Sequence, residues 1–193
     1  MSDMSIILAS ASPRRRELLE NVGVRDMKII PAHGEEHVPE GAGADEAVMA
    51  ISRAKAAEVA EQCSGEDVII AADTVVCLDG DILGKPHSEA EAEEMLSRLS
   101  GREHEVYTGV TVMRGGETLC GVERTAVRFR ALTAAEIRSY VATGEPMDKA
   151  GAYGAQGVAS LFVEGITGDF FNVMGLPMCR LGRMLNELGV SLL

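Results

Sequence analysis

The chain has 193 residues, 46% of them hydrophobic and 25% charged, a composition typical of a globular protein that buries a core. Its formal net charge of −12 argues against binding to a nucleic acid polymer, because such binding depends on clustered Lys and Arg. No apolar run reaches the roughly 18 residues of a membrane span, and no basic segment precedes the short apolar run over 6–9. The four cysteines form no CxxC pair, which is typical of reduced, buried cysteines. Together these features predict a cytoplasmic protein without a membrane partner.

Strand and helix signals alternate through the first half of the chain. Ser12 and Pro13 suit the start of a helix, Gly23 suits its end, and Asp79-Gly80 signals a tight hairpin. In chain order we expect a strand over 5–9, a helix after Ser12, a strand over 27–30, a loop over 31–44, a helix over 45–62 and a strand over 67–78.

The second half contains a further hairpin and three helices. Gly115-Gly116 separates two long apolar segments, which indicates a tight turn between strands. We expect a helix over 88–99 capped by His87 or Ser88, strands over 104–114 and 117–130, a helix from Thr133 to 143, loops and short strands over 148–173, and a helix over 176–188. Helices and hairpins are intermixed, so the pattern predicts a mixed α/β fold with a mixed sheet, in a single domain over 1–193.

The segment that opens the first helix combines hydroxyl groups with arginines. Arg14 and Arg15 lie one turn before two leucines and therefore face inward, where a guanidinium needs an anionic partner. Together with the hydroxyls of Ser10 and Ser12 and the free N–H groups of a helix start, they would form a phosphate cradle. Alternatively, the arginines are solvated and pair with glutamates of the same helix.

Two charged residues interrupt apolar patterns. Lys55 shares a helix face with Val48, Ile51 and Val59, so it either reaches the surface along that face or points into a cleft. Asp73 lies inside an apolar strand, where a carboxylate is costly unless it is paired, hydrogen-bonded or bound to a metal. A catalytic or metal-linked role for Asp73 is the sharper interpretation, and a structural hydrogen-bond network is the alternative.

Three further positions carry weaker signals. Glu36 lies in a loop, where a carboxylate is usually solvated but could bind Mg²⁺. The histidines at 33 and 37 flank it, but no Cys or further His supports a zinc site. Lys85 follows a glycine and could meet a phosphate, and Gln156 could read a base edge with its amide or belong to a polar loop.

Together these positions resemble the Maf-like nucleotide pyrophosphatases over nearly the whole chain. Each motif is weak alone, but their order is specific. They are Ser-x-Ser-Pro-Arg-Arg at 10–15, Glu36, Lys55, Ala72-Asp73-Thr74, Gly84-Lys85-Pro86, Gly-Arg-x-His-x-Val-x-Thr-Gly at 101–109, the segment 148–157, and Asn172-Val173-x-Gly175-Leu176-Pro177.

The resemblance implies an elongated, twisted mixed sheet flanked by helices, with two lobes around a deep cleft. It also implies hydrolysis of a nucleoside triphosphate to the monophosphate and pyrophosphate, a divalent metal cofactor (Mg or Mn), a homodimer, and a link to septum formation. By motif, Asp73 matches the proton acceptor, and Arg14, Thr74 and Gln156 match positions tied to substrate choice. The Ala-Asp-Thr and Ala-Gln-Gly versions are similar to the branch acting on dTTP and UTP.

From these matches we expect Glu36 and Asp73 to hold the metal, with Asp73 also taking a proton from the attacking water. Whether one carboxylate serves both roles stays open at this point. Lys55 and Lys85 would balance charge during the reaction. Two alternatives are a pyrophosphatase of the sister branch, acting on 7-methyl-GTP, and a regulator that binds nucleotide without turnover.

Overall fold

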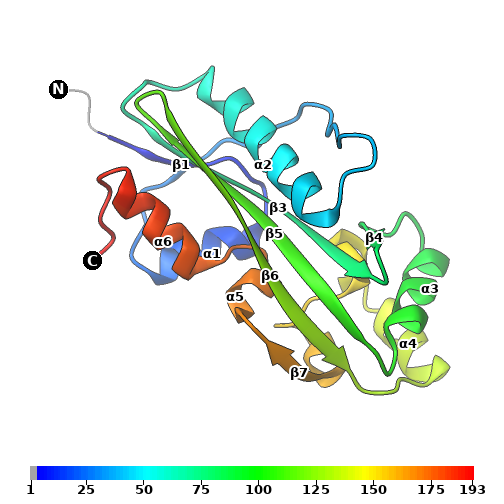
Figure 1. The fold of residues 1–193 in the computed structure, drawn as a ribbon. Coiled ribbons are helices and arrows are strands. Elements are labelled where there is room, and N and C mark those ends of the chain that lie inside the picture. The colour runs from blue at the N-terminus through cyan, green and yellow to red at the C-terminus, as the bar shows by residue number, and fades with distance from the viewer. Residues whose placement is uncertain (1–3) are drawn as a thin grey trace. The chain divides into compact units, whose positions relative to one another are not determined.

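A computed structural model describes residues 4–193 of the chain (Figure 1), and within them seven strands form one sheet in the order β2-β1-β3-β5-β6-β7, with β4 paired to β3. β1 is parallel to β2 and β3, whereas β3–β4 and β6–β7 are antiparallel. The prediction of a mixed sheet flanked by helices is therefore confirmed. The strands are β1 (Ile6–Leu8), β2 (Lys28–Ile29), β3 (Val68–Leu78), β4 (Asp81–Leu83), β5 (Glu103–Arg114), β6 (Glu117–Phe129) and β7 (Val163–Thr167).

The α-helices are α1 (Pro13–Asn21), α2 (Ala44–Ala60), α3 (Glu89–Leu99), α4 (Ala134–Val141), α5 (Phe170–Met174) and α6 (Met178–Glu187). Three short 3-10 helices, η1 (Glu145–Asp148), η2 (Ala150–Ala152) and η3 (Val158–Leu161), fill the segment after α4. The sequence predicts only loops and short strands over 148–173, and this is wrong for η2, η3 and α5. Helical turns this short leave too few residues to show a periodic apolar pattern.

The residues group into two compact units. The first comprises the described residues up to Asp73 with Thr108–Glu123 and Gly175–Leu193, and the second comprises Thr74–Tyr107 and Arg124–Met174. Three strands, β3, β5 and β6, contribute residues to both units. The single domain over 1–193 stays a prediction.

In the first unit, β1 and β3 pack against α2. Ile7, Ile69 and Val59 belong to one core cluster and are at most 4% exposed. Successive side chains of a strand point to opposite faces, so Leu8 and Ile70 face away from α2, toward the side where Figure 1 draws α1 and α6. Both are fully buried. Coverage of both faces explains why these strands have continuous apolar sequences.

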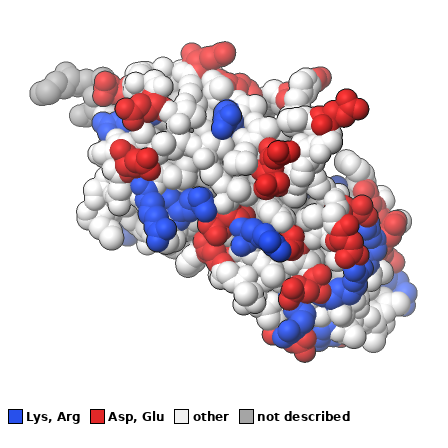
Figure 2. All heavy atoms as spheres, viewed as in Figure 1, with Lys and Arg blue, Asp and Glu red and all other residues white. Residues whose placement is uncertain are grey.

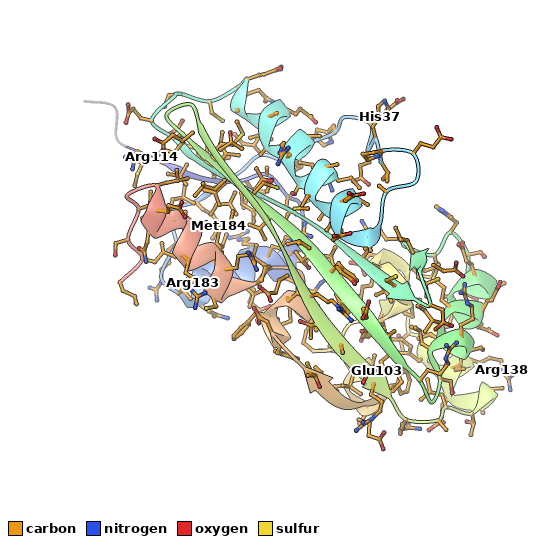
Figure 3. The ribbon with its side chains drawn as sticks, viewed as in Figure 1. His37, Glu103, Arg114, Arg138, Arg183 and Met184 are labelled. Carbon is orange, nitrogen blue, oxygen red and sulfur yellow. The ribbon has the colours of Figure 1, made fainter. Side chains whose placement is uncertain are left out.

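Helix α2 is anchored on β5 by a close backbone approach. A Cβ atom at Gly109 would lie 2.3 Å from the carbonyl oxygen of Val48, so only glycine fits there. Next to this contact, Ser52 Oγ and Thr111 Oγ1 share a buried hydrogen bond of 2.9 Å. At the turn end of β5, Arg114 Nη1 donates to the carbonyl oxygen of Leu188 at 2.7 Å, which ties the strand to the segment after α6 (Figure 3).

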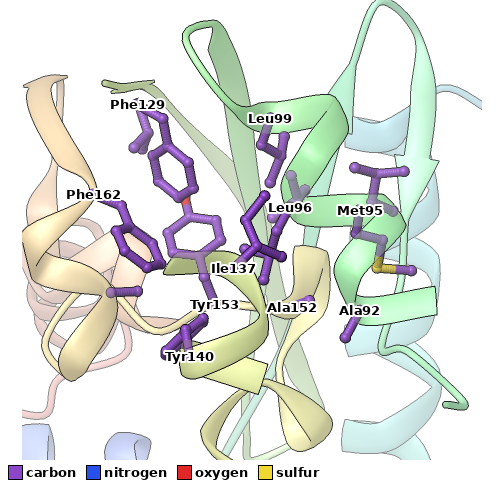
Figure 4. Packing of buried hydrophobic residues seen from close by; sticks show 14 of the residues in the cluster. Ala92, Met95, Leu96, Leu99, Phe129, Ile137, Tyr140, Ala152, Tyr153 and Phe162 are labelled. Atoms are coloured by element: carbon purple, nitrogen blue, oxygen red, sulfur yellow. The ribbon is translucent and has the colours of Figure 1, made fainter. Parts of the chain in front are cut away.

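The second unit concentrates aromatic side chains in its core. Phe129 and Tyr153 meet edge to face with ring centroids 4.7 Å apart, and Tyr140 and Phe162 do so at 5.2 Å. Leucines of α3 and Ile137 of α4 surround the rings (Figure 4). Edge-to-face pairs stabilise a core beyond the area that they bury, by about 1 kcal/mol each.

The predicted turns and caps are confirmed with one exception. Asp79 and Gly80 have φ of 53° and 89°, which suits the tight β3–β4 hairpin. Ser88 caps α3 and Thr133 caps α4, each accepting from the backbone three residues on. Ser12 occupies the N-cap position of α1 but its side chain makes no capping hydrogen bond.

Among residues 4–193, no helix is long and apolar enough to cross a membrane. On the face drawn in Figure 2, basic and acidic side chains are interspersed, and the acidic ones are prominent. Acidic side chains next to basic ones offer no continuous basic track along this face.

His104 is a buried polar residue in the aromatic core of the second unit. It is 2% exposed, and its Nε2 lies 2.7 Å from the Tyr153 hydroxyl. Its Nδ1 has no hydrogen-bond partner among the described residues. Burial lowers the pKa of His104 from 6.5 to about 4, because the imidazolium form would lose its hydration. His104 is therefore neutral in the folded protein at neutral pH.

The low pKa of His104 predicts that acid destabilises the fold. Between pH 6.5 and 4 the unfolded chain binds a proton at this position and the folded chain does not, so the stabilisation present above pH 6.5 is lost as pH falls through this window. From pH 7 to 5 the loss from this group is about 2 kcal/mol. We expect His104→Gln to lose that much less stability than the native protein between these pH values, as measured by urea unfolding. Equal losses in the two proteins would contradict the assignment.

Candidate active site

The start of α1 holds an arginine in a fixed position. Ser10 Oγ accepts from the Ser12 backbone N–H at 3.2 Å and from Arg15 Nη1 at 3.1 Å. Arg15 Nε donates to the carbonyl oxygen of Gly175 at 2.8 Å. The prediction that Arg15 faces inward is confirmed. One pair of the predicted alternative, an arginine with a glutamate of the same helix, is present at Arg16, which contacts Glu20 at 2.7 Å.

Arg15 lies in an electrostatic field shaped by carboxylates of its own unit. Burial lowers the pKa of Arg15 to about 10, because its surroundings solvate the guanidinium less well than water. Asp73 and Glu36 act in the opposite direction, whereas Arg14 adds to the lowering. Arg15 therefore stays charged at neutral pH and is electrostatically coupled to both predicted metal-binding carboxylates.

Lys55 joins those two carboxylates. Its Nζ lies 2.8 Å from Asp73 Oδ1 and 2.7 Å from Glu36 Oε1. The side chains of Lys55 and Asp73 are 20% and 14% exposed, whereas that of Glu36 is 53% exposed. Three residues from a helix, a strand and a loop thus meet at one ammonium group. The structure thus pairs Asp73 with Lys55, whose side chain points at carboxylates, and the catalytic role of Asp73 stays a prediction.

The loop that carries Glu36 is held by a residue that the sequence does not single out. Glu58 of α2 accepts from the backbone N–H groups of His33 and Gly34 at 2.8 and 2.9 Å. A Cβ at Gly34 would lie 2.8 Å from Glu58 Oε2, so glycine permits this approach. These hydrogen bonds lower the pKa of Glu58. Helix α2 thus positions the loop and also supplies Lys55, with which Glu36 pairs.

The side chains near Lys55 offer few donor atoms for a metal ion. Among residues 4–193, no group of three or more His, Cys, Asp or Glu side chains could hold a metal by itself. His37 lies on the loop before α2 (Figure 3), and neither it nor His33 joins such a group. Two hard oxygen donors, those of Glu36 and Asp73, do converge on one cation, the Lys55 ammonium. This donor pair fits Mg²⁺ or Mn²⁺ only if substrate and water complete the ligand set.

The remaining predicted residues belong to the second unit. Thr74 follows Asp73 in β3, and Lys85 and Gln156 are both exposed. The carbonyl oxygen of Gly84 accepts from the Gly151 backbone N–H at 3.0 Å, so the segment with Lys85 contacts the segment that leads to Gln156. Within this unit the structure therefore joins two of the predicted motifs through their backbones.

The chain is similar to known proteins over nearly its whole length. The family model described as Maf-like protein matches residues 5–188. A dTTP/UTP pyrophosphatase of Symbiobacterium thermophilum is 48% identical over 184 residues, which cover 95% of this chain and 94% of that protein. A dTTP/UTP pyrophosphatase of Bacillus cereus is 48% identical over 186 residues, covering 96% of each.

Among solved structures, a nucleoside-triphosphatase / dITP/XTP pyrophosphatase from Mycobacterium abscessus is similar at 18% identity and a TM-score of 0.43, over 96% of this chain and 94% of that one. A likeness this distant carries no argument about the site. The family model, by contrast, spans nearly the whole chain, and relatives that are almost half identical cover it equally well. This chain therefore belongs to the Maf-like protein family.

Proposed function

We propose that this protein hydrolyses dTTP and UTP to the corresponding monophosphate and pyrophosphate. The observation that carries the proposal is the contact of Lys55 with both Glu36 and Asp73. These two carboxylates also lie close enough to Arg15 to oppose the lowering of its pKa by burial. Acid and cationic groups in this arrangement suit phosphoryl chemistry, which requires charge neutralisation and a positioned water. The names of the relatives from Symbiobacterium thermophilum and Bacillus cereus support the choice of substrates.

In the proposed reaction, a water oxygen bonds to the α-phosphorus while the bond from that phosphorus to the α–β bridging oxygen breaks. The bridging oxygen leaves with the electron pair as part of pyrophosphate. The attacking water loses a proton, which the Asp73 carboxylate accepts. Lys55 keeps Asp73 in place through its contact at 2.8 Å, so the carboxylate need not reorganise during the step.

Phosphate binding is assigned to the start of α1, and charge balance on the phosphates to Lys55 and Lys85. Arg14 and Arg15 supply charge, and Ser10 and Ser12 supply hydroxyl groups beside the N–H groups of the helix start. Lys85, which is exposed, would balance charge on the leaving pyrophosphate. Thr74 and Gln156 are proposed to select the pyrimidine, because an amide offers both a donor and an acceptor to a base edge.

Glu36 and Asp73 are proposed to hold a divalent cation, Mg²⁺ or Mn²⁺, together with oxygens of the substrate. When bound, the cation would supply Lewis acidity and neutralise phosphate charge. The rest of the neutralisation comes from Lys55 and the arginines of α1. The homodimer, the cytoplasmic location and the link to septum formation stay predictions.

A nucleotide panel tests the reaction. Purified protein with Mg²⁺ or Mn²⁺ is given dTTP, UTP, CTP, 7-methyl-GTP and purine triphosphates, and pyrophosphate and orthophosphate are measured separately. We expect pyrophosphate from dTTP and UTP. Release only from 7-methyl-GTP would indicate the sister branch, and binding without release would indicate a regulator.

Replacement of Asp73 by asparagine tests its role as proton acceptor. The amide has nearly the same shape but cannot accept the proton, so we expect kcat for dTTP to fall about 10²- to 10⁴-fold. The affinity for dTTP, measured by calorimetry, should change much less, because asparagine keeps an oxygen for the cation and the direct phosphate contacts are assigned to other residues. A variant within a few-fold of native turnover would rule out Asp73 as the base.

Replacement of Gln156 by glutamate tests base reading. The carboxylate keeps the size of the side chain but loses the amide donor. We expect kcat/KM for dTTP and UTP to fall about tenfold relative to the other nucleotides of the panel, while inhibition by free pyrophosphate is unchanged. Unchanged relative rates across the panel would exclude Gln156 as a selector.

A further inference from the structure

The segment that carries Gln156 is held more firmly than its exposure suggests. Residues 151–155 are buried, and Gln156 is the exposed position that follows them. The buried run belongs to the aromatic core of the second unit, and Ala155 is only 7% exposed within it. The backbone that leads to Gln156 therefore cannot move without disturbing the core.

Glu145 connects this segment to α4. One carboxylate oxygen, Oε2, accepts from the Val158 backbone N–H at 3.0 Å, and the other, Oε1, accepts from the Tyr140 hydroxyl at 2.9 Å. The same hydroxyl accepts from the Gly154 backbone N–H at 3.3 Å. Two side chains thus bind the backbone on both sides of Gln156, two residues before it and two residues after it.

The sequence is adapted to this arrangement at Gly157. A Cβ there would lie 2.3 Å from Glu145 Oε1, closer than any real contact of that kind. Any larger residue would displace the carboxylate from Val158 or from Tyr140. Glycine at 157 therefore serves the close approach of Glu145 rather than a special backbone conformation.

A third contact holds the buried end of the segment. The Tyr153 hydroxyl lies 2.7 Å from His104 Nε2, and both rings pack edge to face against Phe129. Figure 4 shows Tyr153 beside Phe129. Tyr140 is likewise 2% exposed, and burial raises its pKa above the ordinary value, so its hydroxyl stays protonated. Phenylalanine would fill these positions without the cost of burying a hydroxyl, so the hydroxyls are retained for the hydrogen bonds that they make.

We propose that Glu145 and Tyr140 are positioning residues for substrate selection, fixing the backbone around Gln156 so that its amide meets the base in one orientation. This inference rests on the proposed function, in which Gln156 reads the base. Hydrogen bonds are directional, so an amide on a mobile segment would distinguish bases less well. The phosphate contacts, assigned mainly to the first unit, do not depend on this frame.

The readout is the ratio of kcat/KM for dTTP to that for a purine triphosphate. We expect Glu145→Ala to lower this ratio about tenfold and Tyr140→Phe to lower it several-fold, because each releases a backbone contact beside Gln156. Glu145→Gln is the conservative variant, since its amide can accept from Val158 and donate to Tyr140. It should keep the ratio within about twofold of the native value. Tyr140→Phe retains the ring, so it provides the test if Glu145→Ala does not fold.

Thr133→Ala is the matched control. Thr133 caps the same helix, α4, and its Oγ1 accepts from the Glu136 backbone N–H at 3.2 Å, far from Gln156 in sequence. Loss of a cap lowers the unfolding temperature without touching the segment 153–158. We expect the native ratio from this variant. A fall in ratio equal to that of Tyr140→Phe at the same loss of stability would mean that general loosening is the cause, and would overturn the proposal.

Gln156→Ala separates this inference from the function on which it rests. If Gln156→Ala lowers the ratio and Glu145→Ala lowers it no further in the double variant, the two residues act as one unit, as we propose. If Gln156→Ala lowers the ratio but Glu145→Ala and Tyr140→Phe leave it native, the positioning role is wrong and base reading stands. If Gln156→Ala leaves the ratio unchanged, base reading is wrong and the positioning role falls with it.

Discussion

The contact of one ammonium group with two carboxylates is the interaction on which the proposed active site depends. Lys55 lies 2.7 Å from Glu36 and 2.8 Å from Asp73, and it is mostly buried. Without it, the largely buried carboxylate of Asp73 would have lost a cationic partner at 2.8 Å, at a cost in free energy. With it, ion pairs connect the loop of Glu36 and the strand of Asp73 to the helix of Lys55. The ion pairs therefore hold these three elements together and also position the groups to which the proposed reaction assigns roles.

Helix α2 makes this arrangement possible because it is fixed on both sides of Lys55. Before Lys55, the backbone of α2 rests on Gly109 and Ser52 is hydrogen-bonded to Thr111. One turn after Lys55, Glu58 holds the loop that carries Glu36. A lysine side chain has many rotamers, and its restriction costs free energy unless its surroundings are already rigid. The anchors on α2 reduce that cost, because they belong to the fold and are present before any substrate binds.

The sequence predicts the residues that violate a local pattern. It misses those that hold another residue in place through hydrogen bonds to its backbone or to that of its neighbours. Asp73 stands out because it interrupts an apolar strand, and Lys55 because it lies on an apolar helix face. Glu58, Tyr140 and Glu145 do not stand out, since a glutamate or tyrosine on a helix or turn fits many environments. Their partners are backbone N–H groups distant in the chain, and no side-chain pattern reports these. The same limit explains Ser12, whose predicted cap is absent while Ser10 accepts hydrogen bonds from Ser12 and Arg15.

The two units hold their candidate functional groups by different physical means, and the difference matches the part of the substrate that the proposal assigns to each. The first uses ions, because its partly buried cationic side chains need counter-ions while no anionic substrate is bound. Asp73 and Glu36 provide these for Lys55 and, through space, for Arg15. The second unit uses hydrogen bonds, which Tyr140, Tyr153 and the carboxylate of Glu145 make. A base is recognised by the directions of its donors and acceptors and not by charge, so a rigid hydrogen-bonded frame suits the proposed reader, Gln156, better than an ion pair to that residue would.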